Sequence, residues 1–510
     1  MRLRLRLDGR RPRLWHALLL RRIADPAGRH GAVAIEVDAR PGPDPWPANA
    51  DLLFALEALI HRLPRNGASS PVPASDTSAW PQPGIDAPDL IIDLCGDVPA
   101  VGPVPVWRLS FDGLPGAAGL LASLLAGHAP VIALHDRDRL VASGRVGTER
   151  RGIILTSFDD ALMRTVSLVA AALAGRDQGG LDPVRSRTSL APACLPPGRV
   201  LARTGRMLAH AIAQRLYHLC YNAPHWRVGW RRLDGPDLID LRRHPGTGWR
   251  DLPDDGRRFY ADPFPLDHRG ESWVFVEEFV HALGKGIVSA VRFGPAGPVG
   301  RPEPVLEEAE HLSYPFVFVR DGIAWMVPET GSAGTIDLYR AAAYPRGWVK
   351  EATLVSGVVA SDATLVEHAG RWWMFATVRD APLGAPLGSG SYSDALHLWS
   401  APDFRGPWTP HAHNPVLVDV ASARPAGRIA ARGGRLIRPV QDCTEGYGRA
   451  LALARIDRLD DDGYGQTVET LLRAGPEWPG NRIHTLNRSE TLECIDGSVR
   501  SPRLRGLLAH

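Results

Sequence analysis

The sequence predicts two fold classes in one chain: an α/β domain with a parallel sheet, followed by an all-β five-bladed propeller. In residues 1–175, segments with the pattern of buried strands alternate with segments of helical periodicity. That alternation is typical of a parallel sheet covered by helices. From Tyr260 onward one pattern returns at intervals of roughly 50 to 60 residues, a spacing typical of four-stranded propeller blades.

The elements of the first domain follow from hydrophobic periodicity and from turn residues. A loop rich in Pro, Gly and Ser over residues 64–88 divides the domain. The pattern predicts strands over 31–37, 89–95 and 105–111, and helices over 14–24, 49–63, 117–126 and 159–174.

Residues 176–224 are predicted to be a linker that ends in an amphipathic helix. Gly and Pro are frequent between residues 176 and 199, and helical periodicity runs from Val200 to Cys220. The apolar positions are Leu201, Leu208, Ile212, Leu216 and Leu219, and the polar ones include Arg203, Arg206 and Arg215. A basic amphipathic helix can lie on a membrane surface. The more frequent alternative is that its apolar face packs on a neighbouring domain.

The repeat of the second domain, residues 225–510, is most regular in its first three copies. A starting residue is followed eleven positions later by Trp and four further on by a third residue. The copies are Asp262–Trp273–Glu277, Tyr314–Trp325–Glu329 and Asp362–Trp373–Thr377. Fainter copies begin at Arg424 and at His484. Because the fifth copy is short, we expect the strand at His225–Arg232 to complete it and close the ring.

Each copy predicts a strand, a tight turn and a second strand, so its two ends lie side by side. The three starting residues should therefore share one rim with the three third residues, Glu277, Glu329 and Thr377. The repeated Trp residues are expected between the blades, as part of the core. The sequence thus predicts a ring of carboxylates at one mouth of the propeller.

Composition excludes several classes of protein. The chain has 510 residues, 44% hydrophobic and 23% charged, and a formal charge of +3, which does not suggest a nucleic-acid binder. Its five cysteines form no C-x-x-C pair, and His411-Ala-His413 lies in a Pro-rich turn, so we predict no metal and no cofactor. We find no signal peptide and no apolar run of the roughly 18 residues that a transmembrane segment needs. The expected location is cytoplasmic.

The propeller motifs resemble known families. Five blades with Asp262-Pro263 at the first inner strand and Asp362 at the third resemble the five-bladed glycosidase clan of family 43, with its arabinanases, β-xylosidases and levansucrases. The runs look more like the amino-terminal domain of plant glucosamine inositolphosphorylceramide transferases; they are Phe259–Phe264, His311–Phe318, Val327–Thr330, Ser361–Glu367 and Asn481–Asn487. The resemblance implies that Asp262 matches the catalytic Asp of the clan and Asp362 its auxiliary Asp. Blade four departs from the clan, because it offers arginines where the arabinanase branch has its acid.

The first domain resembles the amino-terminal domain of formyltransferases that use formyl-tetrahydrofolate. The similarity lies in residues 89–95, 106–116 and 142–146. Bacterial proteins that join such a domain to this propeller are similar over nearly the whole chain. The formyltransferase family relies on an Asn-x-His pair, which Leu109–Asp112 replaces here. The domain is therefore expected to be degenerate, and an active formyltransferase on an amino sugar is the least favoured function.

We predict that Asp262, Asp362 and Glu329 form the catalytic cluster, because glycoside chemistry needs one protonated and one ionised carboxyl group. Asp262 would be base or nucleophile, and Glu329 is preferred over Glu445 as acid. Predicted substrate contacts are Tyr314, Arg428, Gln441, Glu445, Tyr447, His484 and Asn487. The predicted function is glycosyl hydrolysis or transfer on a glycan or glycoconjugate in polysaccharide or glycolipid metabolism. The alternative is a non-catalytic glycan-binding propeller with a scaffold α/β domain, serving a partner glycosyltransferase.

Overall fold

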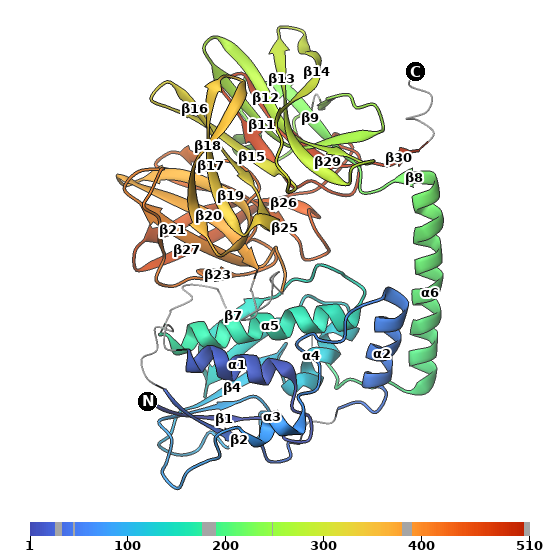
Figure 1. The fold of residues 1–510 in the computed structure, drawn as a ribbon, viewed down its shortest axis with the longest axis vertical. Coiled ribbons are helices and arrows are strands. Elements are labelled where there is room, and N and C mark those ends of the chain that lie inside the picture. Colours follow the sequence, from blue (N-terminus) through green and yellow to red (C-terminus); the bar gives the residue numbers. More distant parts are fainter. Residues whose placement is uncertain (26–32, 44–45, 176–189, 247, 380–389, 504–510) are drawn as a thin grey trace. The chain divides into compact units, whose positions relative to one another are not determined.

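The computed structural model describes residues 1–25, 33–43, 46–175, 190–246, 248–379 and 390–503 (Figure 1). The chain forms two compact units. The first contains Met1–Ala211 together with Asp380–Asp394 and Ala412–Val420, and the second contains Ile212–Arg379, Ala395–His411 and Ala421–His510. Most of the predicted linker, residues 176–189, lies outside the described residues.

One mixed sheet organises the first unit, with strand order β2-β1-β3-β4-β6-β7 and β5 paired to β4. Its strands are β1 (Arg2–Arg6), β2 (Ala34–Asp38), β3 (Leu90–Asp93), β4 (Val106–Phe111), β5 (Leu114–Pro115), β6 (Val131–Asp136) and β7 (Arg139–Arg145). The first four strands of this order pair in parallel, whereas β4–β6 and β6–β7 are antiparallel. The prediction of a parallel sheet is therefore wrong for β6 and β7, which are joined by a turn at Arg137–Asp138 that is too short for a parallel crossover.

Helices and sheet of this unit share one hydrophobic core. The helices are α1 (Leu14–Ala24), α2 (Ala50–His61), α3 (Ala74–Ser78), α4 (Gly116–Leu125) and α5 (Ile154–Leu173). β1 is not among the strands predicted from the sequence, although Leu3 and Leu5 are fully buried in the middle of the sheet. Its alternating arginines look like a solvated basic terminus, but Arg6 is buried and donates from Nε to Asp97 over 2.9 Å.

Two segments that interrupt the propeller sequence belong to the first unit: Asp380–Asp394, between two strands of blade three, and Ala412–Val420, between blades three and four. Asp394, from the first of these segments, accepts a hydrogen bond from Arg164 Nη2 on α5 over 2.7 Å, and both side chains are almost fully buried. The backbone N–H of Gly147 donates to the other oxygen of Asp394 over 2.9 Å. The α/β unit is therefore completed by residues far from it in sequence.

Five antiparallel sheets of four or five strands form the blades of the second unit, a five-bladed β-propeller. Blade one contains β11 (Arg258–His268), β12 (Glu271–Val280), β13 (Lys285–Gly294) and β14 (Gly297–Leu306). Blade two contains β15 (Ser313–Arg320), β16 (Ile323–Glu329), β17 (Thr335–Ala343) and β18 (Arg346–Ser356). Blade three contains β19 (Val359–His368), β20 (Arg371–Arg379), β21 (Ala395–Ala401) and β22 (Thr409–Pro410), whereas β23 (Leu417–Val418) lies in the segment Ala412–Val420 of the first unit. Blade four contains β24 (Ala430–Arg432), β25 (Arg435–Asp442), β26 (Ala450–Asp460) and β27 (Gly463–Leu472).

Blade five joins the two ends of the propeller sequence. Its carboxyl-terminal strands are β28 (Leu486–Arg488) and β29 (Leu492–Ser498), and its amino-terminal strands are β9 (Trp226–Arg232) and β10 (Arg250–Asp251). Strand β9 pairs antiparallel with β29 along its whole length. The expectation that this early strand closes the ring is confirmed. Closure leaves no open edge between the first and last blades.

The inner hairpins of blades one to four share one turn geometry. Each turn has two central residues, and both have positive φ, as in type I′ turns. The turn pairs are Arg269–Gly270, Asp321–Gly322, Ala369–Gly370 and Gly433–Gly434. Because this turn fixes the register of a two-residue hairpin, the equal spacing of the repeat reproduces the same rim in successive blades.

Helix α6 (Pro197–Cys220) has two apolar faces. Val200 and Met207 are buried, whereas the five side chains predicted to pack on a neighbouring domain are exposed. One face of α6 thus packs on the first unit through Val200 and Met207, which belong to its hydrophobic core, but not through the five side chains that the periodicity indicated. Among the described residues, no helix has the length and apolarity needed to cross a membrane.

Candidate functional site at the propeller rim

The rim of the propeller is built from three β-bulges at equivalent places. In blades one to three the inner strand slips by one residue after Ala261, Ser313 and Ser361. The next residues have φ values of 49° at Asp262, 43° at Tyr314 and 58° at Asp362. Positive φ at residues other than Gly is uncommon and is concentrated at functional sites. The predicted pairing of the rim is confirmed, since Ala261 and Ser313 face Glu277 and Glu329.

Each turned backbone is held by a carboxylate from the preceding blade. The N–H of Asp262 donates to Asp496 Oδ2 over 2.9 Å, and that of Tyr314 donates to Asp262 Oδ2 over 3.2 Å. The N–H of Asp362 donates to Glu329 Oε2 over 3.0 Å. The acid groups therefore have two effects: they fix the bulges and they place carboxyl oxygens between neighbouring blades.

Asp362 is the ion-paired member of the cluster. Its Oδ2 accepts a hydrogen bond from Nε of Arg424 over 2.6 Å and another from Nε2 of Gln441 over 3.1 Å. Arg424 Nη2 also lies 3.8 Å from Glu329 Oε2. Burial opposes the charge of Arg424, but the carboxylates and Tyr447 together raise its pKa well above the ordinary value. Arg424 is therefore the fixed cation between two acids.

Asp262 is the centre of a second group, which includes blade five. Its Oδ1 accepts a hydrogen bond from the hydroxyl of Thr485 over 2.7 Å and lies 3.8 Å from Nε2 of His484. Nδ1 of His484 is 2.6 Å from Asp496 Oδ1. Burial raises the pKa of Asp262 to about 6, with His484 opposing the rise and Asp496 and Asp362 adding to it. Burial lowers the pKa of His484, but Asp496 and Asp262 outweigh burial and leave it above the ordinary value.

Two glutamates complete the ring of acids. Burial raises the pKa of Glu329 well above the ordinary value, and the charge of Asp362 adds to this while Arg424 opposes it. Burial also raises the pKa of Glu277 well above its ordinary value, and the charges of Asp262 and Glu329 add to that rise. His311 Nδ1 accepts the N–H of Gly286 over 2.9 Å, so a neutral His311 carries its proton on Nε2, which lies 3.4 Å from Glu277 Oε1. The site thus combines an ion-paired carboxylate with carboxyl groups that tend to keep their proton.

Aromatic rings lie against this cluster. Trp226 stacks on His484 with ring centroids 4.0 Å apart. Tyr447 meets the edge of His484 at 5.1 Å, and the guanidinium of Arg424 lies 4.7 Å from the centre of the Tyr447 ring. Tyr447 remains 37% exposed, so an aromatic ring beside the acids is accessible to a ligand.

The remaining predicted contacts lie elsewhere. The ring of Tyr314 is fully buried, and its hydroxyl is 2.8 Å from Thr364 Oγ1. Arg428 donates its backbone N–H to Asn487 Oδ1 over 2.8 Å, while Asn487 Nδ2 donates to the carbonyl of Pro263 over 3.0 Å. The side chains of Tyr314 and Asn487 and the backbone of Arg428 therefore join neighbouring blades inside the propeller. Glu445 is 54% exposed and pairs with Arg449 over 2.9 Å, apart from the buried acids.

Sequence reasoning missed Asp496, Thr485 and the pairing of Arg424. The spacing that located Glu277 and Glu329 fails in blade five, because its inner strand β28 has three residues and the hairpin is shorter. Asp496 lies near the end of the second strand of the blade-five hairpin, and an acid at that place in a hairpin was the sequence signal that could have identified it. Arg424 was noticed as a departure from the clan, but its partner is in another blade and no spacing shows it.

Asp262, His484 and Asp496 offer ligand atoms within 4.8 Å of one another, so the set has the composition of a metal site. Hydrogen bonds within the set already account for this arrangement. Oδ1 of Asp496 accepts a hydrogen bond from the backbone N–H of Thr485 over 2.9 Å, and the same oxygen contacts Nδ1 of His484. The set thus consists of two carboxylates on either side of the His484 ring, one near each ring nitrogen.

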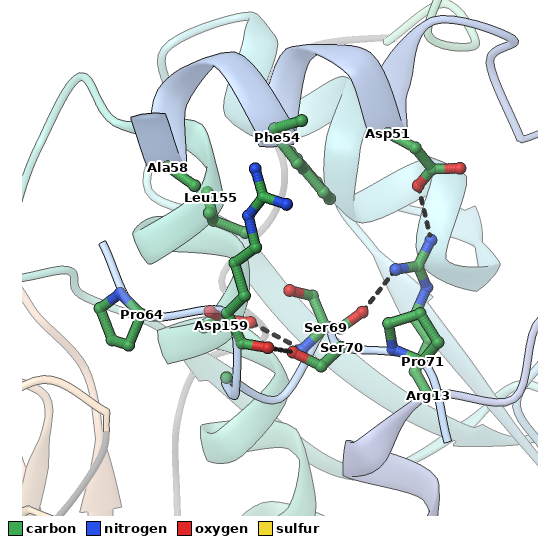
Figure 2. A pocket seen from close by; sticks show the side chains of 13 residues that line it. Arg13, Asp51, Phe54, Ala58, Pro64, Ser69, Ser70, Pro71, Leu155 and Asp159 are labelled. Carbon is green, nitrogen blue, oxygen red and sulfur yellow. Dashed lines mark hydrogen bonds and ion pairs between the residues drawn. The ribbon is translucent and has the colours of Figure 1, made fainter. Parts of the chain in front are cut away.

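The α/β unit has a pocket of about 220 Å³ between α2, α5 and the loop that carries Ser69 (Figure 2). Arg13 donates to the carbonyl of Ser69 over 2.6 Å and reaches Asp51 at 3.5 Å. Asp159 accepts the N–H of Ser69 over 2.7 Å. Arg13 is thus paired with Asp51, and Asp159 holds the backbone of Ser69, so these groups stabilise the walls of the pocket.

Asp112, which stands where the formyltransferase resemblance expects catalytic residues, has a positive φ of 48° and internal partners. Its carboxylate accepts the Ser123 hydroxyl and the N–H of Val131. Its own N–H donates to the Val131 carbonyl over 2.8 Å. These contacts fix the turn between β4 and β5.

Fold and site together define a five-bladed propeller with a rim of buried acids. The family model described as the amino-terminal part of glucosamine inositolphosphorylceramide transferase 1 matches residues 255–495. The protein of that name from Arabidopsis thaliana is 30% identical over 253 residues, which are 47% of this chain and 32% of the relative. The one from Oryza sativa subsp. japonica is 31% identical over 241 residues, 46% of this chain and 31% of the relative. The chain thus spans about a third of the length of these curated relatives.

Solved structures similar to the chain include glycoside hydrolases. Zg3597, of family 117, from Zobellia galactanivorans is 13% identical and has a TM-score of 0.34, covering 54% of this chain and 91% of its own. A family 43 β-xylosidase/α-arabinofuranosidase from a compost microbial metagenome is 12% identical with a TM-score of 0.35, covering 48% and 92%.

Proposed function

We propose that the propeller binds a glycan or glycoconjugate at the cluster of Asp262, Glu329 and Asp362 and cleaves or transfers a glycosyl unit there. The observation that carries the proposal is the electrostatic contrast within one buried cluster. Glu329 tends to remain protonated, Asp262 titrates at a pKa of about 6, and Asp362 is paired with Arg424. Acid–base pairs of glycosidases need such a contrast.

Each residue then has one task. The bond between the anomeric carbon and the leaving oxygen breaks, and that oxygen takes the proton of Glu329. Water or an acceptor hydroxyl attacks the anomeric carbon and loses its proton to ionised Asp262. Asp362 fixes Arg424 and, through its backbone N–H, Glu329. Tyr447 offers an exposed ring against which a sugar can pack.

The substrate class is suggested by the relatives. Their names refer to glucosamine and inositolphosphorylceramide, and the matched part covers this rim. A glycoconjugate that contains an inositol phosphate is therefore our proposed substrate, in glycolipid or polysaccharide metabolism. The second candidate is a glycan-binding propeller that presents its ligand to a partner glycosyltransferase. It is favoured by the match to a part of those transferases that is only a third of their length.

We propose that the α/β unit is a scaffold derived from a formyltransferase-like domain. Leu109–Asp112 lacks both the Asn and the His of that family, and Asp112 is occupied by Ser123 and Val131. Formylated amino sugar above the level without protein would contradict this assignment.

The test uses the whole chain with a hexosamine–inositol phosphate glycan and a panel of aryl glycosides, with products followed by mass spectrometry. Asp262→Asn and Glu329→Gln should each lower turnover by about 100-fold or more. The matched control is Glu445→Gln, an exposed acid that should leave turnover unchanged. Binding without turnover, weakened by Asp262→Asn, would favour the binding module instead. If the variants alter neither turnover nor binding of a probe that the wild type handles, the rim is not the site.

A further inference from the structure

The pocket of the α/β unit combines an apolar wall with a carboxyl group (Figure 2). The apolar wall comes mainly from two helices, since α2 contributes Phe54, Ala55 and Ala58, and α5 contributes Leu155. Asp159 follows Leu155 by four residues on α5, so the two side chains lie on one face of that helix, and both line the pocket. A mostly apolar pocket with a few polar groups is the usual form of a small-molecule site.

Asp159 is a charged group of this pocket without a charged partner. Its Oδ1 accepts the backbone N–H of Ser69 over 2.7 Å, and within the described part of the chain it forms no ion pair. A carboxylate has about four lone-pair sites, so Asp159 can accept further donors from the pocket. Burial raises the pKa of Asp159, while hydrogen bonds from Ser69 and the charge of Arg13 oppose the rise. A cation bound beside Asp159 would offset the unfavourable burial of its charge.

The arginine at the start of α1 is already engaged on three sides. Arg13 donates to the carbonyl of Ser69 over 2.6 Å and reaches Asp51 at 3.5 Å. Its guanidinium carbon also lies 4.4 Å from the centre of the Trp46 ring. The other arginine of the lining, Arg65, is exposed to solvent, where its charge is screened. The polar function that the pocket offers to a ligand is therefore an anionic acceptor, which favours a cationic ligand over an anionic one.

The volume of the pocket limits the size of the ligand. At about 220 Å³ it is smaller than the roughly 300 Å³ at which sites for large organic ligands begin. A single ring with a short chain is the size class that follows. None of the residues that line the pocket comes from residues 89–95, 106–116 or 142–146, which carry the formyltransferase resemblance. The pocket is thus distinct from the segments on which that resemblance rests.

We propose that the α/β unit binds a small organic amine in this pocket, with the ammonium group on Asp159 and the apolar body against Phe54, Ala58 and Leu155. The ammonium donates to the carboxylate, and the apolar wall excludes water from the ion pair, which strengthens it. This inference goes beyond the proposed function and does not depend on it, because amine binding requires no turnover at the propeller rim. It gives the unit that we propose as a scaffold a ligand site of its own.

The experiment is isothermal titration calorimetry of the full chain with three probes of similar shape. Phenethylamine is cationic, phenethyl alcohol is neutral and hydrocinnamate is anionic. The amine should bind with one copy per chain, because the pocket offers one carboxylate without a cation. The alcohol should bind at least about tenfold more weakly, since it lacks the charge-assisted hydrogen bond, and hydrocinnamate more weakly still.

Two variants test the two parts of the site. Asp159→Asn should lower the affinity for phenethylamine by about tenfold or more and leave that for phenethyl alcohol unchanged. Asn retains an oxygen that can accept the N–H of Ser69, so the loop should keep its place. Ala55→Met fills the pocket from α2 with a good helix former and should weaken the binding of both probes. The matched control is Asp76→Asn, an exposed acid of the same unit, which should change neither affinity.

Three results would overturn the proposal: no saturable binding of phenethylamine to the wild type, equal affinities for the amine and the alcohol, or wild-type affinity in both pocket variants. If Asp159→Asn does not fold, as judged by circular dichroism, Ala55→Met and the comparison of the three probes decide. Amine binding that Asp262→Asn abolishes would place the amine at the acids of the propeller and would also overturn the proposal.

Discussion

Arg424 is the residue whose removal should perturb the propeller most clearly. Its Nε lies 2.6 Å from Asp362 Oδ2, and the two side chains are 8% and 3% exposed. Arg424→Met keeps most of the apolar stem but leaves the carboxylate of Asp362 buried without its cation. Breaking a buried pair by removing one partner costs about 3–5 kcal/mol. At about 2–4 °C per kcal/mol for a unit of this size, the melting temperature should fall by roughly 10 °C.

The loss should depend on pH. Arg424 is the cation that opposes the rise in the pKa of Glu329. A carboxyl group with a raised pKa in the folded state contributes stability that is present below its unfolded pKa and is lost as pH rises through the folded pKa. Removing Arg424 enlarges that rise and leaves Asp362 uncompensated. The deficit of Arg424→Met should therefore be larger at pH 8 than at pH 5.

Thermal unfolding followed by near-ultraviolet circular dichroism tests this at both pH values. Asp362→Asn in the Arg424→Met background removes the stranded charge and should restore part of the loss. Arg340→Met is the control, because its pair with Glu351 joins side chains that are 39% and 38% exposed and is worth at most about 1 kcal/mol. Equal losses for the two arginine variants, or a loss that neither pH nor Asp362→Asn reduces, would refute the reasoning.

Two further predictions concern blade contacts. His484→Gln removes the group that opposes the rise in the pKa of Asp262, so the acidic limb of the pH profile of turnover should move above pH 6. An acidic limb that stays in place or moves to lower pH would contradict this prediction. Glu445→Gln is the control and is measured in the same pH profile. Gly427 has φ 136°, and a Cβ there would lie 1.9 Å from the carbonyl oxygen of Leu486, so Gly427→Ala should lower the melting temperature strongly. Gly235→Ala, where a Cβ meets nothing within 4 Å, should be nearly neutral, and equal melting temperatures for the two variants would contradict the predicted clash.

The propeller could be predicted because its repeat is determined by residues that are close together in the sequence. Turn pairs such as Asp321–Gly322 fix two-residue hairpins, and those hairpins fix the spacing from Asp262 to Glu277. The same argument located Glu329 beside the start of its own inner strand. Features that depend only on local spacing can therefore be predicted from a single sequence.

Other features depend on partners that no local rule connects. β1 in the middle of the α/β sheet resembles a basic terminus until Asp97 and Arg6 are seen together. The antiparallel β6–β7 pair is a hairpin inserted where alternation of strands and helices predicts a parallel sheet. The exposed leucines of α6 follow ordinary amphipathic periodicity, and periodicity does not tell which face of a helix is covered. Burial, not pattern, distinguishes these cases.

The rim itself shows why the site was only half visible. Each bulge is fixed by an acid of the preceding blade: Asp496 holds Asp262, Asp262 holds Tyr314, and Glu329 holds Asp362. The repeat describes what one blade contains, whereas the site consists of contacts between blades. Asp496 is contributed by blade five, which is complete only when β9 pairs with β29. Closing the ring and forming the acid cluster are therefore the same structural event, so a change that loosens β9 should disturb Asp262 before it disturbs Asp362.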